Sequence, residues 1–494
     1  MLTLTDLFCG AGGSSSGAAL VPGVEIRYAA NHWQLAVDTH NTNHPATDHA
    51  CADISQVDPR LFPRTDLLWA SPSCTNHSQA RGRRRAADIQ PDLFGELLPD
   101  EAAERSRATM WDVVRFAEQH RYRAMVVENV VDAAKWVMWP AWQHALSLLG
   151  YRFKVVYLNS MHAAIGGDPA PQSRDRLYVV CWRAEDRAPD LDQWIRPRAW
   201  CPNCDREIRA VQAWKNPDRP WGRYRFQYLW RCPAVSCRNT VVEPAWLPAS
   251  TVIDWQLRGE RIGDRPTRVF RDKTTKQIIG EGPLSPKTMA RIRAGLQRFV
   301  GDPALLVPTG GTRRDAAAPV SLPMSTRTTT ENDALLIPVE ARDGLHARPV
   351  TAPARTMTGR SETALLVPYY SNGTAQAVGQ PMATVTTRDR FAFVVPLRNN
   401  NTAKALTEPL DTVAASGNHH GLATAATTVE DCEFRMLEPS EIARAMAFDP
   451  AYVILGNRRE RVRQAGNAVT PPAARDLVSA LAQALGHDVG QVAA

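Results

Sequence analysis

The amino-acid sequence predicts an α/β protein whose first part is a doubly wound, Rossmann-like sheet. Within residues 1–183, short apolar runs typical of buried strands alternate with stretches of helical periodicity. A glycine-rich turn at Gly10–Gly13 follows the first apolar run, and the chain turns helical again after Phe434. Because 494 residues are too many for one ordinary domain, we expect further domains beside the sheet.

The expected elements of the sheet follow from local patterns. Its strands are short runs of apolar and β-branched residues, namely Leu2–Phe8, Val24–Ala30, Asp66–Ala70, Ala124–Val127, Phe153–Leu158 and Arg176–Trp182. A helix is expected over Thr109–His120, where apolar side chains share one face. The last helix is expected to have Thr470 as its N-cap and Pro471 in its first turn.

The rest of the chain divides by composition. Residues 1–183 would form the catalytic and cofactor-binding domain, residues 184–250 an insertion, and residues 251–300 a basic linker with a helix over Ser285–Val300. Residues 301–430 contain the similar segments ALLVP, ALLIP, ALLVP and FVVP, about one per 28–30 residues. This repeat predicts a mostly β domain of four stacked hairpins. Residues 431–494 would return to the catalytic domain.

Four cysteines of the insertion have the spacing of metal ligands. Cys201 and Cys204 are separated by two residues, and Cys232 and Cys237 by four. Four thiolates in this arrangement fit a tetrahedral structural zinc, as in zinc ribbons. The alternative is two reduced cysteine pairs without a metal. The sequence therefore predicts a zinc-ribbon-like insertion.

Charge and compartment give further expectations. The formal net charge is +7, and the segment from Arg196 to Arg238 has ten Lys or Arg against three Asp or Glu. Clustered basic charge suits a polyanionic partner. The first strand starts at the second residue, which leaves no room for a signal peptide, and no apolar run approaches the roughly 20 residues that span a membrane. We expect a soluble, cytoplasmic protein that does not bind membranes.

Reactive side chains follow three of the expected strands. Cys74 comes shortly after one strand, Glu128 ends another, and Arg174 and Arg176 stand where a third begins. A single cysteine is most often a small buried hydrophobe. Ligands and nucleophiles of α/β sheets, however, gather at one edge of the sheet. A thiol, a carboxylate and two guanidinium groups at that edge indicate a catalytic site.

The motifs DLFCGAGG, PSC, ENV, QSRDR and QAGNAV, in this order, closely resemble the DNA cytosine-5 methyltransferases. The resemblance covers residues 1–183 and 434–485, with a variable target-recognition region between them. It implies methyl transfer from S-adenosylmethionine to C5 of a cytosine flipped out of double-stranded DNA. It also implies a monomer that works in a bacterial or phage-infected cell, as in restriction-modification.

The resemblance assigns roles to individual residues. Cys74 would add to C6 of cytosine, Glu128 would hold N3 and the amino group, and Arg176, with Arg174 as a second candidate, would bind the O2 side. Phe8 and Trp33 would stack on the adenine of the cofactor. The remaining cofactor contacts would come from Gly10, Gly12, Gly13, His32, Asp53, Ile54, Asn467, Ala468 and Val469.

Two positions depart from the family pattern. Ser73 separates Pro72 from Cys74, where the family has proline directly before the cysteine. His32 stands where the family has an acid that binds the ribose hydroxyls. The histidine is either a neutral replacement with similar geometry or a sign of altered cofactor affinity.

Sequence recognition is expected in the middle of the chain. Four arginines at repeat ends could reach guanines in the major groove, or could be solvated hairpin tips: Arg327, Arg360, Arg388 and Arg390. The arginines and tryptophans of the insertion could hold phosphates, or the insertion could only brace its neighbours. Two other functions stay open: a cytosine-5 methyltransferase acting on RNA, and a DNA-binding homologue with weakened catalysis.

Overall fold

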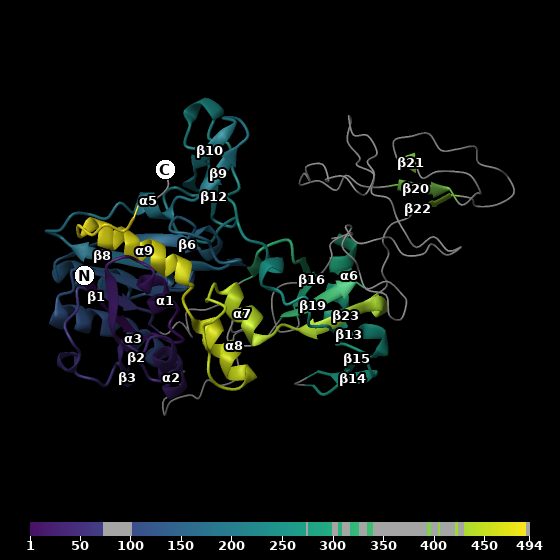
Figure 1. Ribbon diagram of the computed structural model, residues 1–494, viewed down its shortest axis with the longest axis horizontal. Helices are drawn as coiled ribbons and strands as arrows, with labels where there is room; N and C mark the ends of the chain where they lie inside the picture. The colour runs from purple at the N-terminus through teal and green to yellow at the C-terminus, as the bar shows by residue number, and fades with distance from the viewer. Residues whose placement is uncertain are drawn as a thin grey trace, which may run out of the picture.

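The computed structural model of the chain describes residues 1–72, 101–272, 275–298 and 429–490, together with six short segments: 305–308, 317–325, 333–338, 393–396, 404–405 and 420–422. A large sheet domain contains both the first residues and the C-terminal helix (Figure 1). In this view small hairpins from residues 198–231 lie above it, and a further sheet that includes Cys432–Met436 lies to its right. Within the described ranges, no helix is both long and apolar enough to cross a membrane.

The sheet domain is built on seven strands in the order β3-β2-β1-β4-β5-β8-β6. Their bounds are β1 Leu2–Leu7, β2 Val24–Asn31, β3 Asp48–Cys51, β4 Leu67–Ala70, β5 Ala124–Asn129, β6 Tyr151–Asn159 and β8 Asp175–Arg183. Strands β1 to β5 pair in parallel, and β8 runs antiparallel between β5 and β6. The expected Rossmann-like α/β fold is therefore confirmed, with β3 as an additional edge strand.

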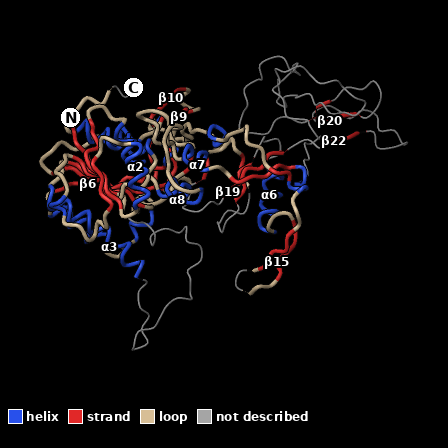
Figure 2. The backbone as a smooth tube through the Cα atoms, turned by 60° about the horizontal axis from the view of Figure 1, so that its bottom comes forward, coloured by secondary structure: helices blue, strands red, loops and turns tan. Residues whose placement is uncertain are grey.

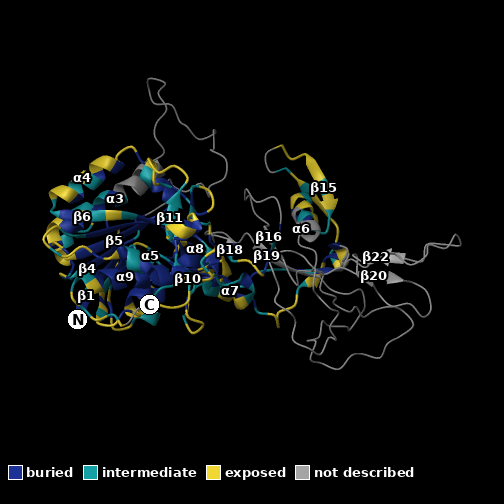
Figure 3. Cartoon of the chain, turned by 90° about the horizontal axis from the view of Figure 1, so that it is seen from above, coloured by how far each residue is buried: buried dark blue, intermediate teal, exposed yellow. Residues whose placement is uncertain are grey.

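Helices cover both faces of this sheet, so its central strands are buried (Figures 2 and 3). One face packs against α1, α5 and α9, and the other packs against α3 and α4. Helix α2 lies beside β2 and β3. The helix bounds are α1 Gly13–Ala19, α2 Gln34–Asn43, α3 Glu101–His120, α4 Trp139–Leu148, α5 Leu191–Ile195 and α9 Pro471–Ala484.

The C-terminal helix joins the sheet domain closely. A Cβ atom added to Gly17 of α1 would lie 2.2 Å from the carbonyl oxygen of Pro471, so only glycine permits this approach. Thr470 is the N-cap of α9 as expected, but its hydroxyl lies 2.7 Å from Ser160 Oγ instead of capping the helix. The C-terminal residues thus return to the sheet domain and complete one of its two cores.

The insertion consists of two hairpins with a core of their own. Strands β9 (Arg198–Cys201) and β10 (Arg206–Arg209) form the first, and β11 (Val211–Trp214) and β12 (Tyr228–Arg231) form the second. Three of the four paired cysteines are buried in this core, and Met161 of the sheet domain packs into it. The insertion and the sheet domain therefore share buried surface.

A five-stranded antiparallel sheet stands beside the sheet domain, in the order β13-β23-β19-β16-β17. Its bounds are β13 Glu260–Arg261, β16 Leu305–Pro308, β17 Ala318–Pro319, β19 Asp333–Pro338 and β23 Cys432–Met436. The first two predicted repeats form β16 and β19, with Leu305 opposite Leu336. The third repeat lies outside the described residues, and the fourth forms β20 (Phe393–Pro396) in a separate three-stranded sheet. Four stacked hairpins therefore remain a prediction.

Short elements complete the described chain. The remaining strands are β7 Gln172–Ser173, β14 Arg268–Arg271, β15 Ile278–Gly282, β18 Met324–Ser325, β20 Phe393–Pro396, β21 Lys404–Ala405 and β22 His420–Leu422. The other α-helices are α6 Pro286–Arg298, α7 Pro439–Ala445 and α8 Arg458–Asn467. The 3-10 helices are η1 Pro59–Leu61, η3 Val131–Lys135, η4 Ser160–His162, η5 Val235–Cys237, η6 Ala249–Val252, η7 Ile262–Asp264 and η8 Val429–Asp431.

Candidate active site

The carboxyl ends of β1, β4 and β5 meet at one edge of the sheet. The backbone nitrogen of Ser71, just after β4, donates to the carbonyl oxygen of Leu7 over 3.1 Å. The side chain of Asn129, at the end of β5, donates to the carbonyl oxygen of Pro72 over 3.4 Å. The segment that leads to Cys74 is therefore held between β1 and β5. Cys74 and Ser73 themselves lie outside the described residues.

Glu128 and Arg176 form a buried ion pair at this edge. Arg176 Nε lies 3.0 Å from Glu128 Oε1, and the two side chains are 13% and 11% exposed. Burial raises the pKa of Glu128 above its usual value, and the neighbouring Arg176 and Arg174 oppose that rise. A buried carboxyl group with a raised pKa can carry a proton and donate a hydrogen bond.

Arg174 faces different partners. Its guanidinium Nη2 donates to the carbonyl oxygens of Gly466 over 3.1 Å and Ala468 over 2.9 Å. Arg174 is 2% exposed. These hydrogen bonds hold the end of α8 and the residue after it against the sheet, whereas Arg176 forms the ion pair with Glu128.

Sequence reasoning missed Asn159, which shapes the same edge. Its side-chain oxygen accepts hydrogen bonds from the backbone nitrogens of Arg174 over 2.9 Å and Met161 over 3.2 Å, and its amide donates to Ser173 Oγ over 3.0 Å. Asn159 is fully buried at the end of β6. The one signal available in the sequence was a polar residue at the end of an apolar strand.

The glycine turn after β1 has the backbone that only glycine adopts without strain. Gly10 and Gly12 have φ values of +54° and +86°. A Cβ atom on Gly13 would lie 2.0 Å from the carbonyl oxygen of Val469. The turn therefore packs directly against the segment that contains Asn467, Ala468 and Val469.

Aromatic and polar groups surround this turn. Phe8 and Trp33 are half-buried after β1 and β2, and His32 and Asp53 are exposed after β2 and β3. The guanidinium carbon of Arg463 lies 4.5 Å from the centre of the Trp33 ring. Ile54 is buried, and its carbonyl oxygen accepts a hydrogen bond from Arg115. Half-buried aromatic side chains and exposed polar groups at the ends of neighbouring strands are residue types that fit a cofactor with an adenosine part.

A buried network of hydrogen bonds lies next to the glycine turn. Asp6 Oδ2 accepts hydrogen bonds from Ser14 Oγ over 2.6 Å and from Ser15 Oγ over 2.7 Å. Ser15 Oγ also lies 2.9 Å from His40 Nε2, and His40 Nδ1 lies 2.8 Å from His49 Nε2. Burial raises the pKa of Asp6 to about 6. Sequence reasoning assigned no role to these residues.

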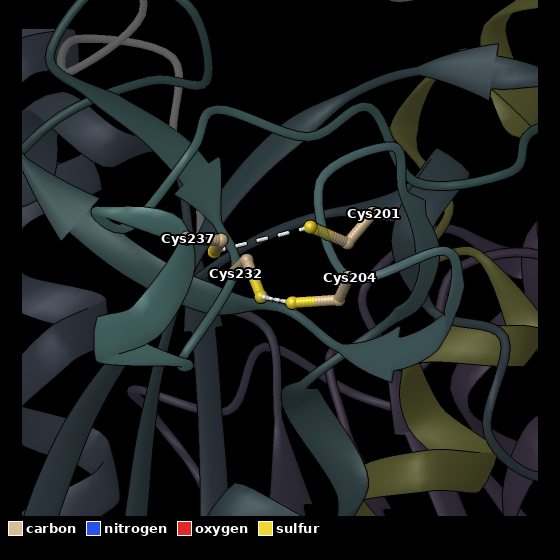
Figure 4. A group of neighbouring side chains, drawn as sticks. All are labelled: Cys201, Cys204, Cys232 and Cys237. Carbon is tan, nitrogen blue, oxygen red and sulfur yellow. Dashed lines mark hydrogen bonds between the residues drawn. The ribbon is translucent and has the colours of Figure 1, made fainter.

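The four paired cysteines come together in the insertion (Figure 4). The sulfur atoms of Cys201 and Cys237 are 4.0 Å apart, and those of Cys204 and Cys232 are 3.7 Å apart. Disulfide bonds of about 2.05 Å are excluded at these distances. A tetrahedral ion with Zn–S bonds of about 2.3 Å places its sulfur ligands roughly 3.8 Å from one another. The thiol set therefore fits one zinc ion.

The proposed base-reading arginines cannot be placed. Arg327, Arg360, Arg388 and Arg390 lie outside the described residues. Several arginines of the insertion do have protein partners: Arg198 pairs with Glu207 over 3.2 Å, and Arg225 pairs with Glu243 over 3.0 Å. These two ion pairs lie within the insertion and are exposed to solvent.

Comparison with known proteins gives a family match. The model of the C-5 cytosine-specific DNA methylase family matches residues 2–199 and 356–483, which make up more than half of the chain. Type II methyltransferase M.NlaX of Neisseria lactamica is 28% identical over 181 residues, 36% of this chain and 52% of that relative. Type II methyltransferase M.AgeI of Thalassovita gelatinovora is 26% identical over 185 residues, 35% of this chain and 38% of that relative. The chain thus matches about half or less of these relatives.

Solved structures show a weaker likeness. The Dnmt2 methyltransferase of S. pombe is 12% identical, with a TM-score of 0.46 and coverage of 98% of this chain and 99% of that one. A mutant DNMT2 of Spodoptera frugiperda is 14% identical, with a TM-score of 0.46 and coverage of 97% and 99%. At these values the likeness says nothing about the substrate.

Proposed function

Because this chain belongs to the C-5 cytosine-specific DNA methylase family, we propose that it transfers a methyl group from S-adenosylmethionine to C5 of a flipped-out cytosine in double-stranded DNA. The observation that carries the proposal is the buried pair of Glu128 and Arg176 at the sheet edge. The segment leading to Cys74 is hydrogen-bonded beside it. A carboxyl, a guanidinium and a thiol are the groups that this reaction requires around the base.

Cys74 is the proposed nucleophile. Cys74 follows Pro72 by two residues in the sequence, and Pro72 accepts a hydrogen bond from Asn129, the residue after Glu128. Cytosine C5 is a poor nucleophile until a thiolate adds to C6, which pushes electron density onto C5. Bound S-adenosylmethionine supplies the electrophilic methyl group. Loss of the C5 proton to a base then expels the Cys74 thiolate and restores the aromatic ring.

Glu128 is proposed to carry the charge change on the base. Addition of a thiolate at C6 makes N3 more basic, so a proton donor at N3 stabilises the adduct. Burial raises the pKa of Glu128, which favours the protonated carboxyl that can donate there. Arg176 beside it would hold the O2 side, and Arg174 would act by holding the segment at Gly466.

The cofactor is proposed to lie at the carboxyl ends of β1, β2 and β3. Phe8 and Trp33 would contact the adenine, and the turn at Gly10, Gly12 and Gly13 would leave room for the methionine part. His32 would donate a hydrogen bond to the ribose. The remaining contacts would come from Asp53, Ile54, Asn467, Ala468 and Val469.

We also propose that the insertion binds one structural zinc ion through its cysteine cluster. Sulfur separations of 3.7 and 4.0 Å support this, because they match a tetrahedral zinc site. Two hairpins with so small a core also need a stabilising cross-link such as a metal ion, as small domains generally do. Cys201, Cys204, Cys232 and Cys237 would all be ligands.

Residues 184–430 are proposed to choose the DNA sequence. The catalytic pocket receives one cytosine, so neighbouring bases must be read by side chains elsewhere. Basic stretches over residues 196–238 and 255–300 supply charge for phosphates. Arg327, Arg360, Arg388 and Arg390 are the proposed base-reading side chains.

The direct test is transfer of radiolabelled methyl groups by the full chain. Duplex DNA, single-stranded DNA and RNA of the same sequence would be offered, followed by identification of the methylated nucleoside. We expect 5-methylcytosine in duplex DNA. Label in RNA alone would favour the RNA methyltransferase, and binding of DNA without any transfer would favour the catalytically weakened homologue.

A further inference from the structure

We infer that the cysteine-rich insertion, residues 196–246, is a brace that positions the cytosine-binding residues, with Arg223 as a positioning residue. The inference rests on the proposed function, since it takes Glu128 and Arg176 as contacts to the base. Three sets of contacts carry it. Each joins the insertion to a segment that is next in sequence to a residue of the sheet edge: η3 after Glu128, the start of β8 at Arg176, and η4 after Asn159.

The first set holds the residues that follow Glu128. The guanidinium of Arg223 pairs with the carboxylate of Asp132, whose side chain is 9% exposed. Trp221 Nε1 donates to the carbonyl oxygen of Val131 over 3.0 Å. Lys135 Nζ lies 2.9 Å from Asp132 Oδ1 and 4.1 Å from the centre of the Trp221 ring. The insertion thereby fixes η3, which begins three residues after Glu128.

The second set holds the start of β8. The backbone nitrogen of Tyr224 donates to Asp175 Oδ1 over 3.0 Å. Asp175 stands between the two arginines of the site, and its carbonyl oxygen accepts a hydrogen bond from Arg176 Nη1 over 2.9 Å. Arg176 in turn contacts Glu128. A shift of Tyr224 would therefore pass through Asp175 to the guanidinium that faces the base.

The third set holds η4, which follows β6. Trp230 Nε1 donates to His162 Nδ1 over 3.0 Å, and the rings of His162 and Tyr224 meet edge to face at 4.6 Å. Met161 belongs to the buried core of the insertion. Asn159, just before these residues, accepts the backbone hydrogen bond of Arg174. The insertion thus reaches all three segments that support the sheet edge.

These contacts also suggest why the insertion carries a metal-type cluster. A chain of about 50 residues gains only marginal stability from its own core. A brace must be rigid to hold η3 and β8 in place, and four sulfur ligands on one ion would supply that rigidity. For Arg223 these contacts favour bracing over phosphate binding, because its guanidinium pairs with Asp132 in the sheet domain.

Arg223→Gln and Arg198→Gln make a matched pair for the test. Each removes one charge and one ion pair from the insertion, but the pair of Arg198 with Glu207 stays within the β9–β10 hairpin. In the full chain, we expect Arg223→Gln to lower kcat up to about 100-fold through misplacement of the site. Its KM values for cofactor and DNA should stay within about twofold, since uniform binding is untouched. Arg198→Gln should match the wild type, and Arg223→Lys should recover part of kcat.

Amide hydrogen exchange gives a second readout that does not depend on activity. Arg223→Gln should lose protection in residues 131–135, where Arg198→Gln should not. A wild type without methyl transfer would refute the proposed function, and the exchange measurement would still decide the brace. Equal behaviour of the two variants in kcat and exchange would overturn the inference. A raised KM for DNA with unchanged kcat would overturn it in favour of a DNA-binding surface.

Discussion

Replacing Glu128 with glutamine removes the charge of the buried carboxyl group and keeps its shape. The glutamine side-chain oxygen can still accept the hydrogen bond that Arg176 Nε donates over 3.0 Å. This amide oxygen carries no proton, so it cannot donate one to N3 of the base as a protonated carboxyl group can. The change therefore separates the proposed chemical role of Glu128 from its place in the fold.

The expected cost to stability is small. Breaking a buried ion pair usually costs about 3–5 kcal/mol, because one charge is left unpaired. In the variant, Arg176 keeps its hydrogen bond to the backbone carbonyl oxygen of Asp175. Its guanidinium also stays near the side-chain carboxylate of Asp175, so its charge is not left alone. One weakened hydrogen bond should therefore lower the free energy of unfolding by about 1 kcal/mol.

The pH dependence of this difference has a definite sign. Burial raises the pKa of Glu128, so ionisation of Glu128 disfavours the folded state. The raised pKa therefore stabilises the folded wild type fully when the pH is below the ordinary carboxyl pKa. This stabilisation is lost as the pH rises through the raised pKa of Glu128. We expect thermal unfolding to show the wild type losing stability relative to Glu128→Gln over that rise.

The expected effect on turnover is much larger. Proton transfer by a positioned group contributes about 10²–10⁴-fold, so kcat should fall by at least about 100-fold. Binding of S-adenosylmethionine, measured by calorimetry, should stay within about twofold. Glu25→Gln, at an exposed position of β2, serves as the control and should leave kcat unchanged. Turnover of Glu128→Gln within tenfold of the wild type, or a parallel loss of cofactor binding, would refute the reasoning.

Three further predictions concern the metal, the cofactor and the target site. Elemental analysis should find one zinc per chain, lost in Cys204→Ser; protein without zinc after purification free of chelators would contradict the proposed site. His32→Glu should leave kcat unchanged and tighten cofactor binding, since a carboxylate accepts hydrogen bonds from both ribose hydroxyls; a large loss of binding in calorimetry would show a different role. The last prediction replaces one repeat arginine at a time with alanine: Arg327, Arg360, Arg388 or Arg390. Each replacement should relax the sequence specificity of methylation, at about 1–3 kcal/mol per lost base contact. If methylation sequencing finds the same target site for all four variants, the sequence is recognised by other residues.

Local patterns were enough to predict the main sheet. Strands such as β1 and β5 are runs of buried apolar residues, and each run is visible in a short window of sequence. Strand β3, Asp48–Cys51, was missed because it lies at the sheet edge and its side chains are exposed or half-buried. A strand that buries little leaves no hydrophobic pattern to read.

The candidate site could be predicted only in part for a related reason. Glu128 and Arg176 follow from the strands that carry them, because strand order brings those ends together. The partners of Arg174 lie 292 and 294 residues away, at Gly466 and Ala468. The contact of Tyr224 with Asp175 spans 49 residues and uses a backbone nitrogen. Such contacts depend on how domains pack, and neither periodicity nor spacing records that.

The measurement that tests the proposed reaction most directly is covalent trapping on duplex DNA that contains 5-fluorocytosine. Fluorine at C5 cannot leave as a proton does, so the thiolate adduct at C6 should persist after methyl transfer. Mass spectrometry of the full chain should find the DNA, with a methyl group on the base, attached at Cys74, and Cys74→Ala should form no adduct and transfer no methyl group. Methyl transfer by Cys74→Ala at a tenth of the wild-type rate or more, or an adduct at another cysteine, would contradict the account.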